Sequence, residues 1–198
     1  MKSLVPIMLV SLAAAPAFAQ TQSPPAKMTA PPAGTQQPAE PGHLPDQGAA
    51  ASTPEFVSSA ESGTQFEIKA AQIALSKTQS PRVKHFAQKM IKDHGKAGQE
   101  LHRILARDQG AQPPQGAPMP QDETQKLQQL QSASGPDFDR AYIGIMLKDH
   151  ETDTNMFRTY ARGGNDPRIR AFARRTLPVI EGHLRLVEKL HREEASRS

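Results

Sequence analysis

The sequence predicts an all-α protein: an antiparallel four-helix bundle made of two helical hairpins joined by a long connection. Beyond residue 53, apolar residues recur at spacings of three and four and never alternate over a useful length, which is typical of amphipathic helices. Proline follows a residue able to cap a helix at Ser80-Pro81 and at Asp166-Pro167. The segments 80–87 and 166–173 match residue by residue in kind, which indicates two related hairpins.

The N-terminus has the three-part order of a cleavable secretory signal in residues 1–19. Lys2 precedes an apolar run from Leu4 to Ala15, and Ala17-Phe18-Ala19 follows, so we expect cleavage after Ala19. The run is shorter than the roughly 20 residues that span a bilayer, and no later stretch approaches that length. We therefore expect a periplasmic or secreted protein with no transmembrane segment after signal cleavage.

Residues 20–53 are rich in proline, alanine and glutamine and contain almost no large apolar residue. Such a segment cannot bury enough apolar surface to offset the entropy of ordering, so it is predicted to be a disordered spacer. Residues 54–193 are predicted to form the bundle domain, and residues 194–198 a short tail.

Within the bundle, the first helix is expected over residues 54–78, and the second begins at Ser80-Pro81. The third begins near Gly135 and ends at Gly163-Gly164, where glycine can adopt the left-handed conformation of a C-terminal cap. The fourth begins at Asp166-Pro167. Between the hairpins lie a Pro/Gly-rich stretch, 110–121, and a polar helical piece, 122–132. This long connection favours a ferritin-like bundle, in which one crossover links two hairpins.

Composition excludes several classes of function. The chain has no cysteine, so it has no disulfide, thiolate ligand or cysteine nucleophile. Its formal net charge of +4 is mild, and basic and acidic residues are mixed, so we expect no nucleic-acid partner. No nucleophile–base–acid set, phosphate loop or dinucleotide fingerprint is recognisable, so no catalytic residue is assigned and a non-enzymatic protein is favoured.

Each predicted helix carries a titratable residue on its apolar stripe. Glu67 lies on the first stripe, His94 on the second and His183 on the fourth. On the third, the stripe of Phe138, Tyr142, Ile145, Met156 and Tyr160 encloses Asp149 and Asp153, with His150 at its edge. His85 and His102 point elsewhere.

These residues are near the middle of their helices, so an antiparallel bundle should bring them to one height. A buried carboxylate is costly unless it is paired, and carboxylate with neutral imidazole suits iron, manganese or zinc. The candidate metal ligands are Glu67, His94, Asp149, His150 and His183. The alternative is a buried histidine–carboxylate network that fixes helix register.

The motifs resemble an exported bacterial family catalogued as domain of unknown function 4142. The resemblance rests on Met90-Ile91-Lys92-Asp93-His94, on Phe138-Asp139-Arg140-Ala141-Tyr142 leading to His150, and on Phe172-Ala173 with Leu177-Pro178 and His183. It implies a ferritin-like bundle in the periplasm or associated with the outer membrane, without a settled activity. Glu67, His94, His150 and His183 match the polar positions of that family's helices.

The sequence departs from di-iron ferritin-like proteins, which place a glutamate three residues before a histidine on two helices. Three residues before His94, His150 and His183 stand Ile91, Leu147 and Ile180. We therefore expect a mononuclear metal or none. Two functions remain: a non-enzymatic envelope protein that binds an unknown envelope partner or has a structural or stress role, which is preferred, and a metal-binding protein for storage, buffering or oxidation.

Overall fold

The structure is a computed structural model that describes residues 52–109 and 119–196. The chain divides into a unit of residues 1–43 and a unit of residues 44–198, and the second unit contains every described helix. The predicted signal peptide, residues 1–19, lies outside the described residues, as does the predicted spacer apart from its last two residues. The stretch 110–118 of the connection is also outside them.

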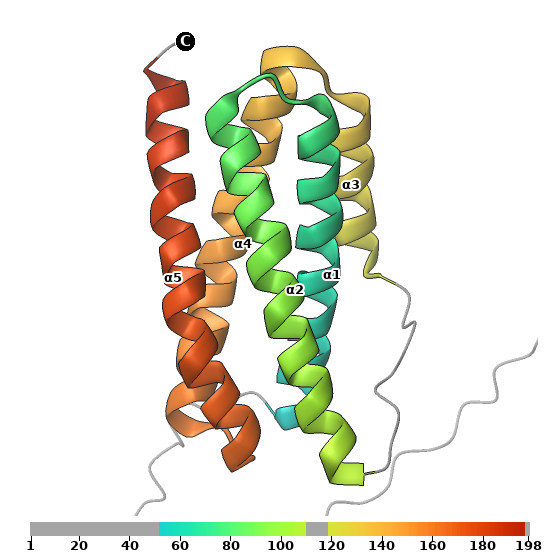
Figure 1. Cartoon of the computed structure of the whole chain (residues 1–198), viewed down its shortest axis with the longest axis vertical. Coiled ribbons are helices and arrows are strands. Elements are labelled where there is room, and N and C mark those ends of the chain that lie inside the picture. The colour runs from blue at the N-terminus through green and yellow to red at the C-terminus, as the bar shows by residue number, and fades with distance from the viewer. Residues whose placement is uncertain (1–51, 110–118, 197–198) are drawn as a thin grey trace, which may run out of the picture. The chain divides into compact units, whose positions relative to one another are not determined.

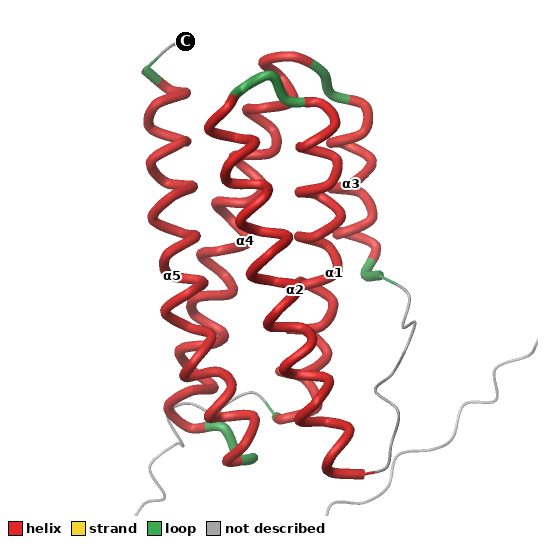
Figure 2. The backbone as a smooth tube through the Cα atoms, viewed as in Figure 1, coloured by secondary structure: helices red, strands yellow, loops and turns green. Residues whose placement is uncertain are grey.

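The described residues form five α-helices and no strand (Figures 1 and 2), which confirms the all-α prediction. The helices are α1 (Thr53–Lys77), α2 (Pro81–Gln109), α3 (Gln121–Ser132), α4 (Gly135–Gly163) and α5 (Pro167–Ala195). The polar helical piece expected in the connection is α3, and α5 extends two residues into the predicted tail.

Four of these helices form an antiparallel bundle. Helix α1 packs against α2 and α4, and α5 packs against the same two helices. Figure 1 shows α1 and α5 running in one direction and α2 and α4 in the other, so every packed pair is antiparallel. The hairpins α1–α2 and α4–α5 are joined by a connection that contains α3, which packs along both α1 and α4.

The helix starts follow from local capping, as expected. Ser52 accepts a hydrogen bond from the Glu55 amide, and the Glu55 side chain accepts one from the Ser52 amide, which makes a capping box before α1. Asp166 accepts bonds from the amides of Arg168 and Ile169 at 2.8 and 3.0 Å. Proline occupies the first helical position in α2 and α5, where no amide partner is needed.

The expected left-handed glycine cap of α4 is wrong. Gly164 has a φ of −59°, which any residue can adopt. A Cβ at Gly164 would lie 2.4–2.6 Å from carbon atoms of the Tyr160 ring, so glycine is required there by close approach instead. Among the described glycines, positive φ occurs at Gly135, at 54°, where α4 begins.

The core of the bundle consists of two apolar layers that are separated along each of the four bundle helices. One layer contains Phe66, Phe86, Phe138 and Met146. The other contains Phe56, Leu101, Phe157 and Phe172. Residues 94 of α2, 150 of α4 and 183 of α5 each fall between the two layers in sequence, so the middle of the bundle is left to polar side chains.

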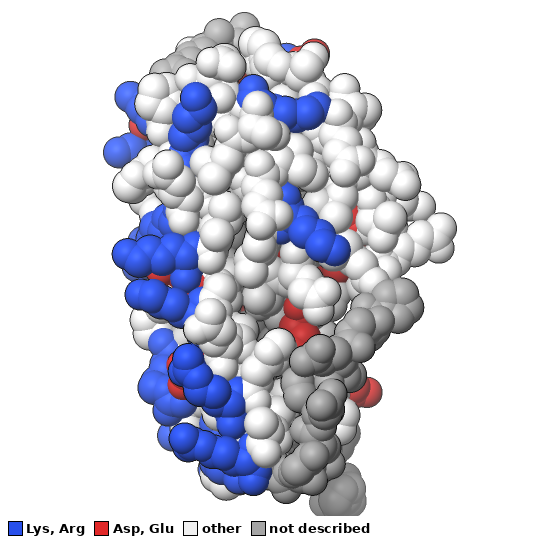
Figure 3. All heavy atoms as spheres, turned by 45° about the vertical axis from the view of Figure 1, so that its right-hand side comes forward, with Lys and Arg blue, Asp and Glu red and all other residues white. Residues whose placement is uncertain are grey.

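The surface carries basic and acidic side chains together. In the face drawn in Figure 3, lysines and arginines gather along one flank, with acidic residues among them. Ion pairs join Arg175 of α5 to Glu100 of α2, and Arg158 of α4 to Glu181 of α5. Within residues 52–109 and 119–196, no helix has the length and apolar character needed to cross a membrane.

Candidate metal centre

A polar layer occupies the middle of the bundle, and each of the four bundle helices contributes one side chain to it. These side chains are Glu67 from α1, His94 from α2, His150 from α4 and His183 from α5, and none is more than 6% exposed. The sequence predicted that Glu67, His94, Asp149 and His183 would converge, and three of these four belong to this layer. His150 was expected at the edge of its stripe and is instead fully buried at the centre.

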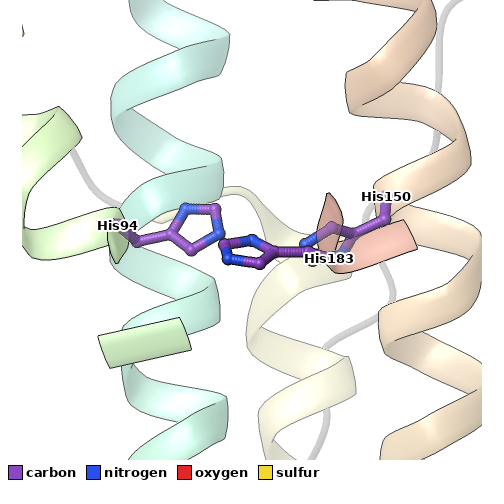
Figure 4. A group of neighbouring side chains, drawn as sticks. All are labelled: His94, His150 and His183. Atoms are coloured by element: carbon purple, nitrogen blue, oxygen red, sulfur yellow. The ribbon is translucent and has the colours of Figure 1, made fainter. Parts of the chain in front are cut away.

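The three histidines point toward one another (Figure 4). One ring nitrogen from each can be chosen so that all three atoms lie within 4.8 Å of one another. The ring centroids are separated by 5.8 Å for His94 and His150, 5.2 Å for His94 and His183, and 5.5 Å for His150 and His183. Histidines on three different helices therefore form one cluster, which we call the His triad.

Each histidine of the triad is oriented through one ring nitrogen. Nδ1 of His94 lies 2.8 Å from Oε2 of Glu67. Nδ1 of His150 donates to the Met146 carbonyl at 2.9 Å and lies 3.3 Å from Oε1 of Glu67. Nε2 of His183 donates to Oδ2 of Asp93 at 3.0 Å. The bonds to Met146 and Asp93 fix the orientations of the His150 and His183 rings and leave their opposite nitrogens as acceptors. An ionised Glu67 would favour the same tautomer at His94.

The opposite nitrogens have no partner. Nε2 of His94, Nε2 of His150 and Nδ1 of His183 are buried and make no hydrogen bond to any described residue. Leaving a buried acceptor unsatisfied costs about 1–3 kcal/mol each, so three together in one layer are unusual for a purely structural network. One ligand that accepts three lone pairs would satisfy all of them.

Burial sets the charge of this layer. Desolvation lowers the pKa of His94, His150 and His183 to about 4 each, so all three are neutral at neutral pH. Desolvation also raises the pKa of Glu67 to about 7, against the opposing effect of His150. Neutral imidazole is the protonation state that binds metal ions.

The donor set fits a transition metal. If the triangle edges are at most 4.8 Å, its centre lies within about 2.8 Å of each nitrogen, compared with about 2.0–2.1 Å for a zinc–imidazole bond. A shift of under about 1 Å per ring would close that difference, which is within the reach of side-chain rotation. Carboxylate or carbonyl groups behind the ligating imidazoles are the usual outer partners of metal-bound histidine.

Asp149 is not among the side chains grouped in the His triad, although it was expected on the inward stripe. Its Oδ1 accepts a bond of 2.7 Å from Nζ of Lys126 on α3. The error has a physical cause: α3 packs along α4 and half-buries that flank, so the apolar pattern of α4 covers two faces. After Tyr142, which lies on the expected stripe, the inward face of α4 carries Met146, His150 and Thr154. Each of these three stands one position after a residue of the expected stripe.

Asp93 was missed as a partner in this layer. It is 17% exposed in its side chain, and it is held by Lys89 at 2.6 Å as well as by His183. Burial alone would raise the pKa of Asp93, but the hydrogen bonds from Lys89 and His183 lower it overall. The available signal was its position directly before His94, which places it on the flank of α2 that faces α5.

A cavity of about 240 Å³ reaches the polar layer between α1, α2 and α5. Its inner wall includes Glu67, His94 and His183, and its outer part is bounded by the exposed residues Gln65, Gln99 and His102. The His triad is therefore connected to the surface on this side.

The fold and the buried layer define an all-helical bundle with a central histidine cluster. The chain belongs to the family described as Domain of unknown function (DUF4142), whose sequence profile matches residues 38–190. No curated protein matches the chain.

Several solved structures share the fold. CopM in its Cu(II)-bound form superimposes with a TM-score of 0.61 at 19% identity, covering 70% of this chain and 94% of CopM. CopM in its Cu(I)-bound form gives 0.60 at 18% identity, covering 72% and 96%. A DUF305 fragment from Deinococcus radiodurans gives 0.58 at 20% identity, covering 71% and 98%. At sequence identities of 18–20%, the structural similarity establishes a shared fold.

Proposed function

We propose that this protein is an exported, non-enzymatic metal-binding protein that holds one copper ion with His94, His150 and His183. The observation that carries the proposal is the convergence of three buried histidines, each with one ring nitrogen that makes no hydrogen bond to any described residue. The predicted signal peptide supports export, and the absence of a recognisable catalytic set favours retention of the ion over turnover.

Copper fits the donor set better than iron or manganese. Three neutral imidazoles form the inner set, while the carboxylates of Glu67 and Asp93 face the other side of the rings. Manganese prefers oxygen ligands, and for a given nitrogen site divalent copper binds more tightly than zinc or iron. The shared fold with CopM, which is known in Cu(II)- and Cu(I)-bound forms, supports the same choice.

The surrounding residues are suited to holding the ion. Asp93 supplies negative charge close to the cation and keeps the His183 ring in the ligating tautomer. Glu67 would do the same for His94 when it is ionised, and a bound cation favours its ionised form. The centroid of the Phe86 ring lies 6.3 Å from the centroid of the His150 ring and 6.4 Å from that of the His183 ring. An apolar wall therefore closes the layer on that side. A site closed on one side and open to a cavity on the other can load an ion and retain it.

The experiment is an equilibrium copper titration of the chain from Gln20 onward, with elemental analysis of protein purified from a periplasm. We expect one copper ion per chain. The double variant His94→Ala, His183→Ala should lose it, whereas His85→Ala, His191→Ala, which removes two exposed histidines, should keep it. Equal copper content in both double variants would contradict the proposal. Binding of zinc in place of copper would support the three histidines as the ligands and contradict copper as the metal.

A further inference from the structure

The cavity that reaches the His triad is lined in a regular order on two helices. On α2, His94, Gly98 and His102 follow one another at intervals of four residues. On α1, Glu67, Thr64 and Glu61 follow at intervals of three. Residues three and four apart share one face of a helix, so the two rows run together from the buried layer to the surface.

The outer end of the cavity carries a second pair of metal-ligating side chains. Nε2 of His102 lies 3.4 Å from Oε1 of Glu61. The His102 side chain is 53% exposed, whereas the Glu61 side chain is 10% exposed, and its buried Oε1 makes no hydrogen bond to any described residue. The pair lies about 12 Å along α2 from His94, given a helical rise of about 1.5 Å per residue.

Gly98 lines the cavity between the two ends, where α1 and α2 approach each other closely. A Cβ built there would lie 3.3 Å from Cγ2 of Thr64, which shows how closely α1 and α2 approach. The glycine therefore leaves the space between His102 and His94 open, and a larger side chain at this position would obstruct it.

We propose that Glu61 and His102 form an outer, weaker cation site that captures the ion and passes it along this cavity, past Gly98, to the His triad. The inference rests on the proposed copper function. One carboxylate and one imidazole give two ligands, enough to hold an ion transiently and too few to compete with three buried imidazoles. A carboxylate at a cavity mouth also raises the local cation concentration, and charge focusing of this kind increases association rates by about 10- to 1,000-fold.

The test separates the rate of loading from its extent. The metal-free chain is mixed with glycine-buffered Cu(II), and the copper–imidazole absorption is followed in time. Glu61→Gln should load about tenfold more slowly than the unaltered chain, the lower end expected for loss of charge focusing. His102→Ala should also load more slowly, because it removes the second ligand of the outer site. Both should still reach one copper ion per chain at equilibrium. Gly98→Leu should slow loading and chelator-driven release together, because it obstructs one path used in both directions.

His85→Ala is the matched control, since His85 is an exposed histidine on the same helix that does not line the cavity. It should load at the unaltered rate, and circular dichroism melting verifies that each variant folds. If His102→Ala and Glu61→Gln load as fast as His85→Ala, the outer site is refuted while the copper function stands. If the unaltered chain takes up no copper at equilibrium, the proposed function fails first, and this inference fails with it.

Discussion

Oε2 of Glu67 on α1 lies 2.8 Å from Nδ1 of His94 on α2, and both side chains are more than nine-tenths buried. The contact crosses the interface of the first hairpin and turns the free nitrogen of His94 toward the other two histidines. One carboxylate thereby orients a ligand and supplies negative charge to the same layer, because its other oxygen lies 3.3 Å from His150.

Replacing this carboxylate should separate metal binding from stability. Glu67→Gln should weaken copper binding by about 10- to 100-fold, the usual cost of losing an outer partner of a ligating histidine. The metal-free variant should melt no lower than the unaltered chain. A neutral amide avoids the free-energy cost of burying a charged carboxylate, the same cost that raises the pKa of Glu67. Glu181→Gln, which removes a surface partner of Arg158, should leave the affinity unchanged. A variant that loses stability and keeps its copper affinity would show that Glu67 is structural.

The stability of the metal-free protein should fall on acidification. The histidines of the triad have pKa values lowered to about 4 from 6.5. Between these two pH values the unfolded chain binds protons that the native protein does not. Glu67 has the opposite sign, because its pKa is raised from 4.5 to about 7 and the native state holds the extra proton. Burial also raises the pKa of Asp153, which gives it the same sign as Glu67. Three histidines against these two buried carboxyl groups leave a net uptake of at most about one proton on unfolding between about pH 4.5 and 6.5.

The free energy of unfolding should therefore decrease by at most about 1.4 kcal/mol per pH unit within that window. Urea unfolding at several pH values measures this slope. His150→Leu should make the slope shallower by about one proton, and copper should protect the unaltered chain against acid. Stability that rises as the pH falls from 6.5 to 4.5 would contradict the burial of neutral imidazoles.

Phe86 and Phe138 both belong to the same apolar layer, but only Phe86 has its ring beside the histidines of the triad. Changing either to alanine should destabilise the protein by about 3–5 kcal/mol, because both are fully buried. Copper affinity should fall, by roughly tenfold, in Phe86→Ala alone, because the space it leaves lets two ligating rings turn. Equal loss of affinity in both variants would indicate a general effect of destabilisation.

Two glycines of the second hairpin should respond oppositely to alanine. A Cβ at Gly164 would overlap the Tyr160 ring, so Gly164→Ala should destabilise the protein by about 1–3 kcal/mol. Gly144 lies inside α4 with no atom within 4 Å of its Cβ position, so Gly144→Ala should stabilise by about 0.5–1 kcal/mol. Thermal melting of the two variants measures both effects. Stabilisation by Gly164→Ala would contradict the close approach of the Tyr160 ring to this position.

The sequence predicted the hairpins and most of the polar layer because these depend on local signals. Ser80-Pro81 and Asp166-Pro167 set the helix starts directly. Glu67, His94 and His183 stand on helices that have a single apolar face, which packs into the centre of the bundle. Capping and a single apolar face are visible in a sequence without knowledge of the tertiary contacts.

The errors arose where a tertiary contact altered a local pattern. Packing of α3 on α4 half-buries Asp149 beside Lys126. The sequence pattern of α4 alone therefore did not distinguish this flank from the inward face that carries His150. Asp93 is polar and flanks its stripe, and only the position of α5 reveals its bond to His183. The requirement for glycine at residue 164 depends on where the Tyr160 ring lies.

X-ray absorption spectroscopy of the copper-loaded protein tests the central claim most directly, because it counts the imidazoles bound to the ion. The His triad predicts three imidazole ligands in the unaltered chain and two in His150→Ala, whose missing ring comes from the second hairpin. A copper ion bound by oxygen ligands alone, or a spectrum that is identical in the two proteins, would contradict a site built from His94, His150 and His183.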